Sequence, residues 1–281
     1  MRSAAILFLF MFYVSGISAQ TGKYSVYALK FASAGERMPA SVMALDANPK
    51  DSVNIDFSIW LIKGEDGRNI LVDAGFRGDV EGAIDFKLNF YNRPDSVLMK
   101  MGLQGSDITD IIISHPHWDH IDGLPLFPNA KVWMQKEDYT YFAVGAWQKD
   151  GNHGGFDPRD VRIFTDLNLA GRLNLVDGDN KEIFPGITVF TGSKHTFNSQ
   201  YVRVDTGKKK IILASDNIWI YYSLDHMVGP SKGGTLDNTA YVNAMKRMKT
   251  LASDPKLIIP GHDSRVFERF TQVKPGVALI Q

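Results

Sequence analysis

The sequence contains no cysteine and carries no formal net charge. The absence of cysteine excludes a cysteine-ligated structural zinc site, and it leaves no thiol that an oxidising compartment could damage. Because 31 basic residues balance 31 acidic ones, the overall field would not attract a nucleic acid. The single dense basic run, residues 208–210, lies between two strand-like segments and is expected to form a solvated hairpin tip.

Long apolar runs are also missing, apart from one short stretch at the N-terminus. Arg2 precedes an apolar run over residues 4–14, and small residues follow as far as Ala19. The run is too short to span a bilayer, and the pattern is typical of a secretory signal peptide. We therefore expect residues 1–19 to be a signal peptide and Gln20 to begin the mature chain. The protein is expected to be periplasmic or secreted, without a membrane anchor.

The rest of the chain has ordinary globular composition, with 44% hydrophobic and 22% charged residues. We expect a single domain over residues 20–281, because chains of this size are commonly built around one core. Segments rich in β-branched and aromatic residues are predicted to be strands, namely residues 24–31, 55–63, 69–72, 110–114, 131–134, 187–191, 201–204, 211–214 and 256–259.

Helical periodicity is clearest late in the chain. A helix is predicted after the capping residue Asp237, where apolar side chains repeat at helical spacing (Tyr241, Met245, Met248 and Leu251). A second helix is predicted over residues 136–141. Residues 145–170 are glycine-rich and weakly periodic, so a long loop is expected there. Together these segments predict an α/β fold.

Three histidines and an aspartate cluster near the middle of the chain, directly after the apolar residues 111–113. They are His115, His117, Asp119 and His120. Histidine and aspartate are the ligands of catalytic metal sites that keep a position open for water. His115 and His117 alternate on an extended segment and can share one ion. Asp119 and His120, displaced by the following turn, would bind a second ion.

Four more candidates each follow an apolar strand: Asp73, His195, Asp216 and His262. A histidine distant in sequence is needed to complete the coordination sphere of each metal ion. Asp216 is the expected bridge between the two ions. Five of the seven histidines fall in this pattern, whereas His153 and His226 lie in polar stretches and are expected to be exposed. The alternative is that the histidines are unrelated surface or core residues and that Asp119 and Asp216 cap helices.

The pattern resembles the metallo-β-lactamase superfamily, whose members carry H-x-H-x-D-H followed by a later histidine, aspartate and histidine. The resemblance implies an αββα sandwich of two mixed sheets flanked by helices, with a dinuclear metal site at one edge. It also implies that Asp73 orients a ligating imidazole. The implied ligands are His115, His117 and His195 for one metal, Asp119, His120 and His262 for the other, and Asp216 as the bridge.

Within the superfamily, the chain most resembles the N-acyl homoserine lactonases. The bridging Asp216 argues against typical β-lactamases, and too few residues follow His262 for the helical domain of the glyoxalase II branch. In the lactonases a tyrosine shortly after the bridging aspartate contacts the lactone. Here Trp219 occupies the third position after Asp216, so Tyr221 and Tyr222 are the candidate tyrosines.

The resemblance implies hydrolysis of an acylated lactone by a hydroxide that bridges two divalent ions, with zinc as the default metal. Asp119 or Asp216 would carry the proton to the leaving group, and a homodimer is expected by analogy. A broader lactonase or esterase, a β-lactamase, and a noncatalytic metal or redox protein remain alternatives. Candidate walls of an apolar substrate channel are Trp118, Phe142, Trp147, Phe156, Trp219 and Tyr222, of which Phe142 is expected to belong to the core.

Overall fold

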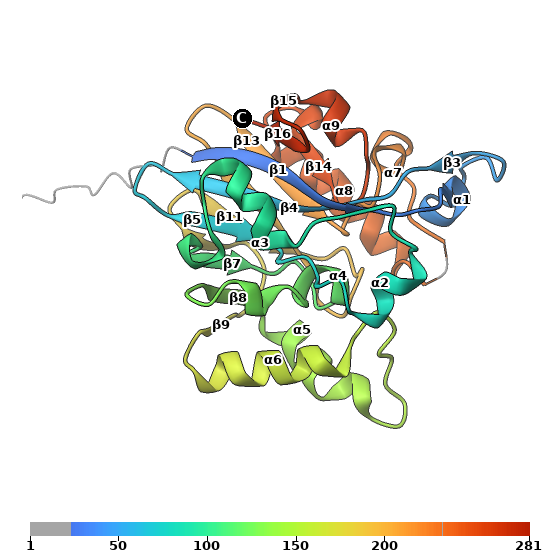
Figure 1. The fold of residues 1–281 in the computed structure, drawn as a ribbon. Coiled ribbons are helices and arrows are strands. Elements are labelled where there is room, and N and C mark those ends of the chain that lie inside the picture. The colour runs from blue at the N-terminus through green and yellow to red at the C-terminus, as the bar shows by residue number, and fades with distance from the viewer. Residues whose placement is uncertain (1–23, 232) are drawn as a thin grey trace, which may run out of the picture.

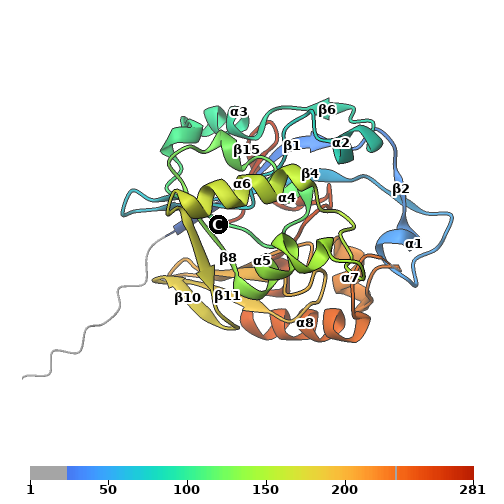
Figure 2. The ribbon, with the colours of Figure 1, turned by 90° about the horizontal axis from the view of Figure 1, so that it is seen from below.

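The computed structural model describes residues 24–231 and 233–281. The predicted signal peptide, residues 1–19, and the predicted mature terminus at Gln20 lie outside the described residues. In the described part, two β-sheets pack face to face and helices cover their outer faces, as Figures 1 and 2 show from two directions. This arrangement is the αββα sandwich that the resemblance to the superfamily implies.

The larger sheet is mixed. Its strands β5, β7, β8 and β9 are parallel, whereas the other pairings in the sheet are antiparallel. A short strand, β6 (Phe90–Tyr91), pairs with β1 beside the main path. The order along the sheet is β15 (Thr271–Lys274), β16 (Val277–Leu279), β1 (Tyr24–Ser33), β4 (Asp56–Gly64), β5 (Asn69–Val72), β7 (Asp110–Ile112), β8 (Lys131–Gln135) and β9 (Leu173–Val176).

The smaller sheet is antiparallel except for its last pair, β13 and β14, which is parallel. Its order is β10 (Lys181–Phe184), β11 (Ile187–Thr191), β12 (Gln200–Asp205), β13 (Lys210–Ser215) and β14 (Ile258–Pro260). The basic residues 208 and 209 lie in the exposed turn between β12 and β13, as predicted. A separate two-stranded antiparallel sheet consists of β2 (Met38–Pro39) and β3 (Ser52–Val53).

The central strands of each sheet are buried on both faces, which explains why their sequences are continuous apolar runs. In β4, Trp60 and Ile62 point into the core between the two sheets, whereas Ile59 and Leu61 point to the helices outside. Because successive side chains of a strand alternate between faces, one strand contributes to two cores. The outer face of the smaller sheet forms a third core with α8 (Asn238–Leu251).

The helix α8 confirms the predicted periodicity. Asp237 caps it by accepting hydrogen bonds from the backbone N–H groups of Thr239 and Ala240, and Met245 and Met248 are fully buried against the sheet. Figure 2 shows α8 on the opposite side of the molecule from α3. The other helices are α1 (Ala40–Met43), α2 (Glu81–Asp85), α3 (Pro94–Leu98), α4 (Trp118–Ile121), α5 (Lys136–Ala143), α6 (Pro158–Leu169), α7 (Tyr221–His226) and α9 (Val266–Arg269).

The prediction of a long loop over residues 145–170 is wrong in its second half, where α6 forms. Asp157 caps this helix by accepting from the N–H of Arg159, and proline occupies its first turn. Phe164 and Leu167 bury its inner face. The predicted strand 256–259 is also displaced, because residues 255–257 form a 3₁₀ turn before β14 begins.

The topology brings several strand ends to one edge of the sandwich. β5 and β7 run in parallel in one sheet, and β13 and β14 run in parallel in the other. β11 has the same direction as β13, because both are antiparallel to β12. Residues that follow these strands can therefore meet. Within residues 24–231 and 233–281, none of the helices has the length and apolar character needed to cross a membrane.

Candidate metal centre

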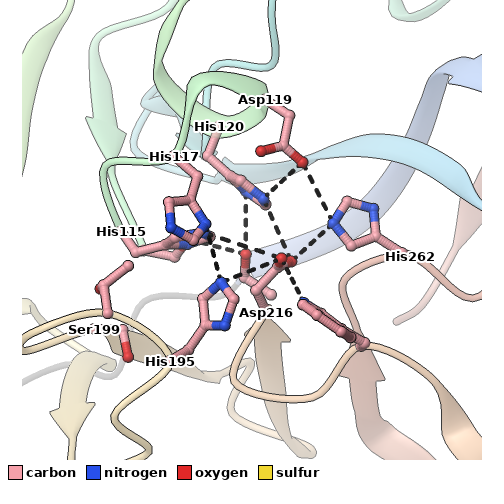
Figure 3. A network of polar contacts seen from close by, with 12 residues as sticks. His115, His117, Asp119, His120, His195, Ser199, Asp216 and His262 are labelled. Atoms are coloured by element: carbon pink, nitrogen blue, oxygen red, sulfur yellow. Dashed lines mark hydrogen bonds and ion pairs between the residues drawn. The ribbon is translucent and has the colours of Figure 1, made fainter. Parts of the chain in front are cut away.

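The seven predicted ligand residues come together at this edge, and Figure 3 shows their side chains converging. One segment of the larger sheet, which follows β7, and three segments of the smaller sheet supply them. His115 and His117 lie between β7 and α4, and Asp119 and His120 lie in α4 itself. The remaining ligand residues follow β11, β13 and β14, and they are His195, Asp216 and His262.

The first group consists of three imidazoles. Nδ1 of His117 lies 3.1 Å from Nε2 of His115 and 3.1 Å from Nε2 of His195. Nδ1 of His195 donates to the carbonyl oxygen of Gly234 at 2.7 Å, so the neutral ring presents an Nε2 lone pair to the group. Lone pairs that face one another at this distance are the arrangement that a cation stabilises.

The second group combines two imidazoles with two carboxylates. Nε2 of His120 lies 3.3 Å from Oδ2 of Asp119 and 3.3 Å from Oδ1 of Asp216. Nε2 of His262 lies 3.0 Å from the same Asp216 oxygen and 3.5 Å from Oδ2 of Asp119. Four ligand atoms thus surround one position.

Asp216 joins the two groups. Its Oδ1 belongs to the second group, whereas its Oδ2 lies 3.5 Å from Nε2 of His195 and 4.0 Å from Nε2 of His115 in the first. One carboxylate therefore faces both positions, as the predicted bridge requires. Neither Asp216 nor Asp119 caps a described helix, because α4 and α7 have no side-chain cap.

Outer hydrogen bonds fix the orientation of the ligating rings. Nδ1 of His120 lies 2.8 Å from Oδ2 of Asp73, the residue predicted to orient an imidazole. Nδ1 of His262 lies 3.1 Å from the carbonyl oxygen of Asp56. Asp73 has φ of 62°, and it also accepts from the N–H and the hydroxyl of Ser114. Such partners set the tautomer that leaves Nε2 free for a metal.

The pKa shifts divide the histidines in the same way. Burial, followed by the neighbouring imidazoles, lowers the pKa of His115 well below its usual value, and burial lowers that of His117 to about 3. At His120, burial opposes the charged ring, but the carboxylates of Asp119 and Asp216 outweigh it and raise the pKa. The first group is therefore neutral, whereas the second attracts positive charge.

The donor set fits two divalent ions. Nε2 of His120 and Oδ1 of Asp216 are both buried, and neither has a hydrogen-bond partner. Burying polar atoms without partners is costly, and a cation between them would satisfy both. Imidazole and carboxylate together suit zinc, iron, manganese or cobalt. The first group would hold one ion, the second would hold another, and Asp216 would touch both.

The two predicted tyrosines have different surroundings. Tyr221 is fully buried in the core between the sheets, with the guanidinium of Arg269 3.6 Å from its ring centroid. Burial also raises its pKa. The structure therefore does not support a substrate contact from Tyr221, because its side chain is a core residue. Tyr222 is half-buried and stacks on the exposed His226 at 3.9 Å.

The predicted channel walls divide between the rim and the core. Phe156 lies 5.5 Å from the ring of His117, centroid to centroid, and Trp118 packs among the phenylalanines under α4. Phe142 is fully buried, as predicted. Trp147 stacks on the exposed His153, with 5.0 Å between the ring centroids. His153 is therefore a surface residue, as predicted.

Several contacts around the ligands were not predicted from the sequence. Gly155 has φ of 80°, and a Cβ there would lie 2.6 Å from Cδ2 of His117. Gly261 similarly approaches Asp216. Trp219 donates its indole N–H to Oδ2 of Asp216 at 2.7 Å. Glycine and tryptophan at these positions follow no ligand pattern, so only three-dimensional proximity identifies them.

Asp122, the residue that follows α4, connects the site to the segment of residues 145–170. Its carboxylate is fully buried, and it accepts from Arg77 at 2.7 Å and from Arg159 of α6 at 2.6 Å. Two guanidinium groups compensate for the burial of its charge. α6 is thereby tied to the end of the helix that carries Asp119 and His120.

Comparisons with known proteins agree with this geometry. The sequence profile of the metallo-beta-lactamase superfamily matches residues 58–262, which contain all the ligand residues of both groups. The chain is 26% identical over 225 residues to an N-acyl homoserine lactonase of a Bacillus species, covering 74% of this chain and 82% of the relative. It is 25% identical over 253 residues to the N-acyl homoserine lactonase of Bacillus cereus, covering 85% and 94%.

The fold also matches solved structures. A dizinc quorum-quenching lactonase in complex with the product N-hexanoyl-L-homoserine superposes with a TM-score of 0.68 at 19% identity, covering 92% of this chain and 95% of that one. An N-acyl homoserine lactone hydrolase with the same product bound at its metal centre gives a TM-score of 0.68 at 18% identity, covering 89% and 97%. These likenesses confirm the predicted fold class.

Proposed function

Because the chain belongs to the metallo-beta-lactamase superfamily, we propose that it is a metal-dependent hydrolase that opens the lactone ring of N-acyl homoserine lactones. The observation that carries the proposal is the position of Asp216, whose two oxygens face two separate ligand groups. The N-acyl homoserine lactonases among the relatives support the choice of substrate.

When bound, two divalent ions, most simply zinc, supply a water of lowered pKa and positive charge for the carbonyl oxygen. The protein's own side chains provide the proton acceptors. Burial opposes the ionised form of Asp216, but the imidazoles of His262 and His120 that face its carboxylate outweigh burial and hold its pKa well below the usual range. The pKa of Asp119 is also lowered. Both carboxylates are therefore ionised at neutral pH.

We assign the transfer of the proton to the ring oxygen to Asp119. Its side chain is 12% exposed, against 5% for Asp216, so it lies nearer the open side of the site. Water adds to the acyl carbon, the ring C–O bond breaks, and the proton lost by the water passes through Asp119 to the leaving oxygen. The product is a single open-chain acid that carries a hydroxyl group.

A substrate panel tests the proposal. Purified protein is loaded with zinc, manganese or cobalt, its metal content is measured, and it is given a homoserine lactone, a simple ester, a β-lactam, a thioester and a phosphodiester. We expect about two ions per chain and fastest turnover of the acylated lactone. Preference for the ester would favour a broad esterase, and preference for the β-lactam would favour a β-lactamase.

Two histidine variants make the panel specific. His195→Ala removes a ligand of the first group, whereas His153→Ala removes an exposed histidine that stacks on Trp147. The first variant should lose metal and activity, and the second should retain both. Equal behaviour of the two variants would refute the metal assignment.

We also propose that the protein is exported, on the evidence of the apolar N-terminal sequence alone. Terminal sequencing of protein from the periplasm or medium should begin near Gln20. A homodimer is proposed by analogy with the family, and light scattering of the purified protein tests it.

A further inference from the structure

Trp219 touches three ligand residues from three different strand ends. Its indole N–H donates to Oδ2 of Asp216 at 2.7 Å. Its ring meets that of His195 edge to face at 5.7 Å between centroids, and its carbonyl oxygen accepts from the backbone N–H of His262 at 3.0 Å. This half-buried residue thus links the bridging carboxylate to one histidine of each group, to His195 through its side chain and to His262 through its backbone.

The tryptophan is itself firmly placed. Its backbone N–H donates to the hydroxyl of Tyr241, which is fully buried beneath the smaller sheet. The far edge of its indole lies against Gly234, where a Cβ would come within 2.6 Å of the ring. The carbonyl of Gly234 is the acceptor for Nδ1 of His195, so the same contact supports the orientation of that imidazole.

A bridging carboxylate needs such a constraint. The torsion about the Cβ–Cγ bond of an aspartate is soft, and its rotation would turn both oxygens away from the two ligand groups. A carboxylate oxygen can accept from more than one partner, so the indole N–H of Trp219 and a metal ion can share Oδ2 of Asp216. The hydrogen bond thereby fixes the rotation without taking the place of an ion.

We propose that Trp219 is a positioning residue of the metal centre, whose indole N–H holds the carboxylate of Asp216 across the two ligand groups. The inference rests on the proposed dinuclear site. It concerns metal binding first and turnover only as a consequence, because the indole acts through Asp216.

The test compares two tryptophan-to-phenylalanine variants. Trp219→Phe keeps a ring but removes the N–H. Trp133→Phe is the matched control, because Trp133 also donates its indole N–H to an aspartate, Asp110, at 3.0 Å, but on the strands β7 and β8 away from the ligands. Competition with a chromophoric chelator measures the affinity for zinc, and the absorption spectrum of the cobalt-loaded protein reports the ligand field.

Trp219→Phe should bind at least one of the two ions about 10–100-fold more weakly, as is typical when an outer partner of a metal ligand is lost. Its cobalt spectrum at full occupancy should be shifted. Trp133→Phe should match the wild type in both readouts. Wild-type affinity and an unchanged spectrum in Trp219→Phe would overturn the inference, even if the variant were less stable.

An NMR measurement on the wild-type protein covers the case in which Trp219→Phe does not fold. With ¹⁵N-labelled indoles, the Trp219 resonance, identified by its loss in Trp219→Tyr, should exchange slowly with solvent and move when zinc is added. An indole proton that exchanges freely with solvent, and whose resonance does not move when zinc is added, would refute the hydrogen bond. Failure of the wild type to bind any ion would instead count against the proposed function itself.

Discussion

A Cβ atom added at Gly261 would lie 2.4 Å from Oδ1 of Asp216, so the backbone before His262 approaches the bridging carboxylate at contact distance. The same Cβ would lie 2.9 Å from the backbone carbonyl carbon of Ser215, which is also too close. Glycine is therefore required at position 261 by the space that Asp216 occupies.

Gly261→Ala should displace the carboxylate of Asp216 and weaken metal binding and turnover about 10–100-fold. Equilibrium dialysis followed by elemental analysis measures the bound metal. The melting temperature of the metal-free variant is the control, because a small change there would separate damage to the site from damage to the fold. Full metal occupancy at wild-type affinity would contradict the expectation.

Gly155→Ala should disturb His117, because the added methyl group would meet the imidazole and the backbone φ of 80° disfavours alanine. Weaker metal binding and at least about tenfold slower turnover are expected. Gly154→Ala is the neighbouring control, since a Cβ there meets only Oδ1 of Asn152, at 3.3 Å. If both variants behave alike, the contact with His117 is not the cause.

Asp73→Asn should weaken binding at the second group. Asp73 accepts from the N–H of Ser114 and faces Nδ1 of His120, and an amide can satisfy only part of this set. We expect about 10–100-fold lower metal affinity, measured by chelator competition. An unchanged affinity for both ions would show that His120 is oriented without this carboxylate.

Asp160→Asn should stabilise the protein at neutral and higher pH. The Asp160 side chain is fully buried, and neither of its oxygens has a hydrogen-bond partner. Burial, then the charge of Asp122 and further that of Asp157, raise its pKa from 3.8 to about 9, although Arg159 opposes this. The folded state therefore keeps a proton that the unfolded state releases, and stability falls as pH rises between these values.

The amide of Asp160→Asn cannot ionise, so this part of the pH dependence should disappear. Thermal unfolding should show little difference near pH 4 and a gain that grows toward pH 8 by up to about 1.4 kcal/mol per pH unit. Asp166→Asn is the control, because Asp166 is exposed on the same helix. Equal gains in the two variants would mean that the burial of Asp160 is not responsible.

The central strands could be predicted because both of their faces are buried. A run such as residues 111–113 needs no partner to be recognised as a strand. The strands β9, β10 and β15 escaped prediction, since their side chains are largely exposed or half-buried and their hydrogen bonding depends on a neighbouring strand. The helix α6 escaped because its buried acid, Asp160, interrupts the apolar stripe.

The ligand residues could be predicted because ligand chemistry limits the residue types and strand ends limit the positions. The contacts of Trp219, Gly155 and Gly261 with the ligand residues could not be predicted, because they depend on what approaches from distant segments. The sequence placed Trp219 only as a candidate channel wall. The burial of Tyr221 could not be predicted for the same reason. Arg269 covers its ring, and sequence spacing alone does not place that arginine.

The ion pair between Asp122 and Arg159 limits how far the sequence of residues 145–170 can vary independently of the rest of the chain. A loop of residues 145–170 transplanted from a relative would bring a new channel wall, but it would also replace Arg159, one of the two cations that neutralise Asp122. The recipient would then be left with an undercompensated buried charge next to the helix that carries Asp119 and His120. A grafted segment that is to change the substrate range must therefore keep an arginine at the position of Arg159.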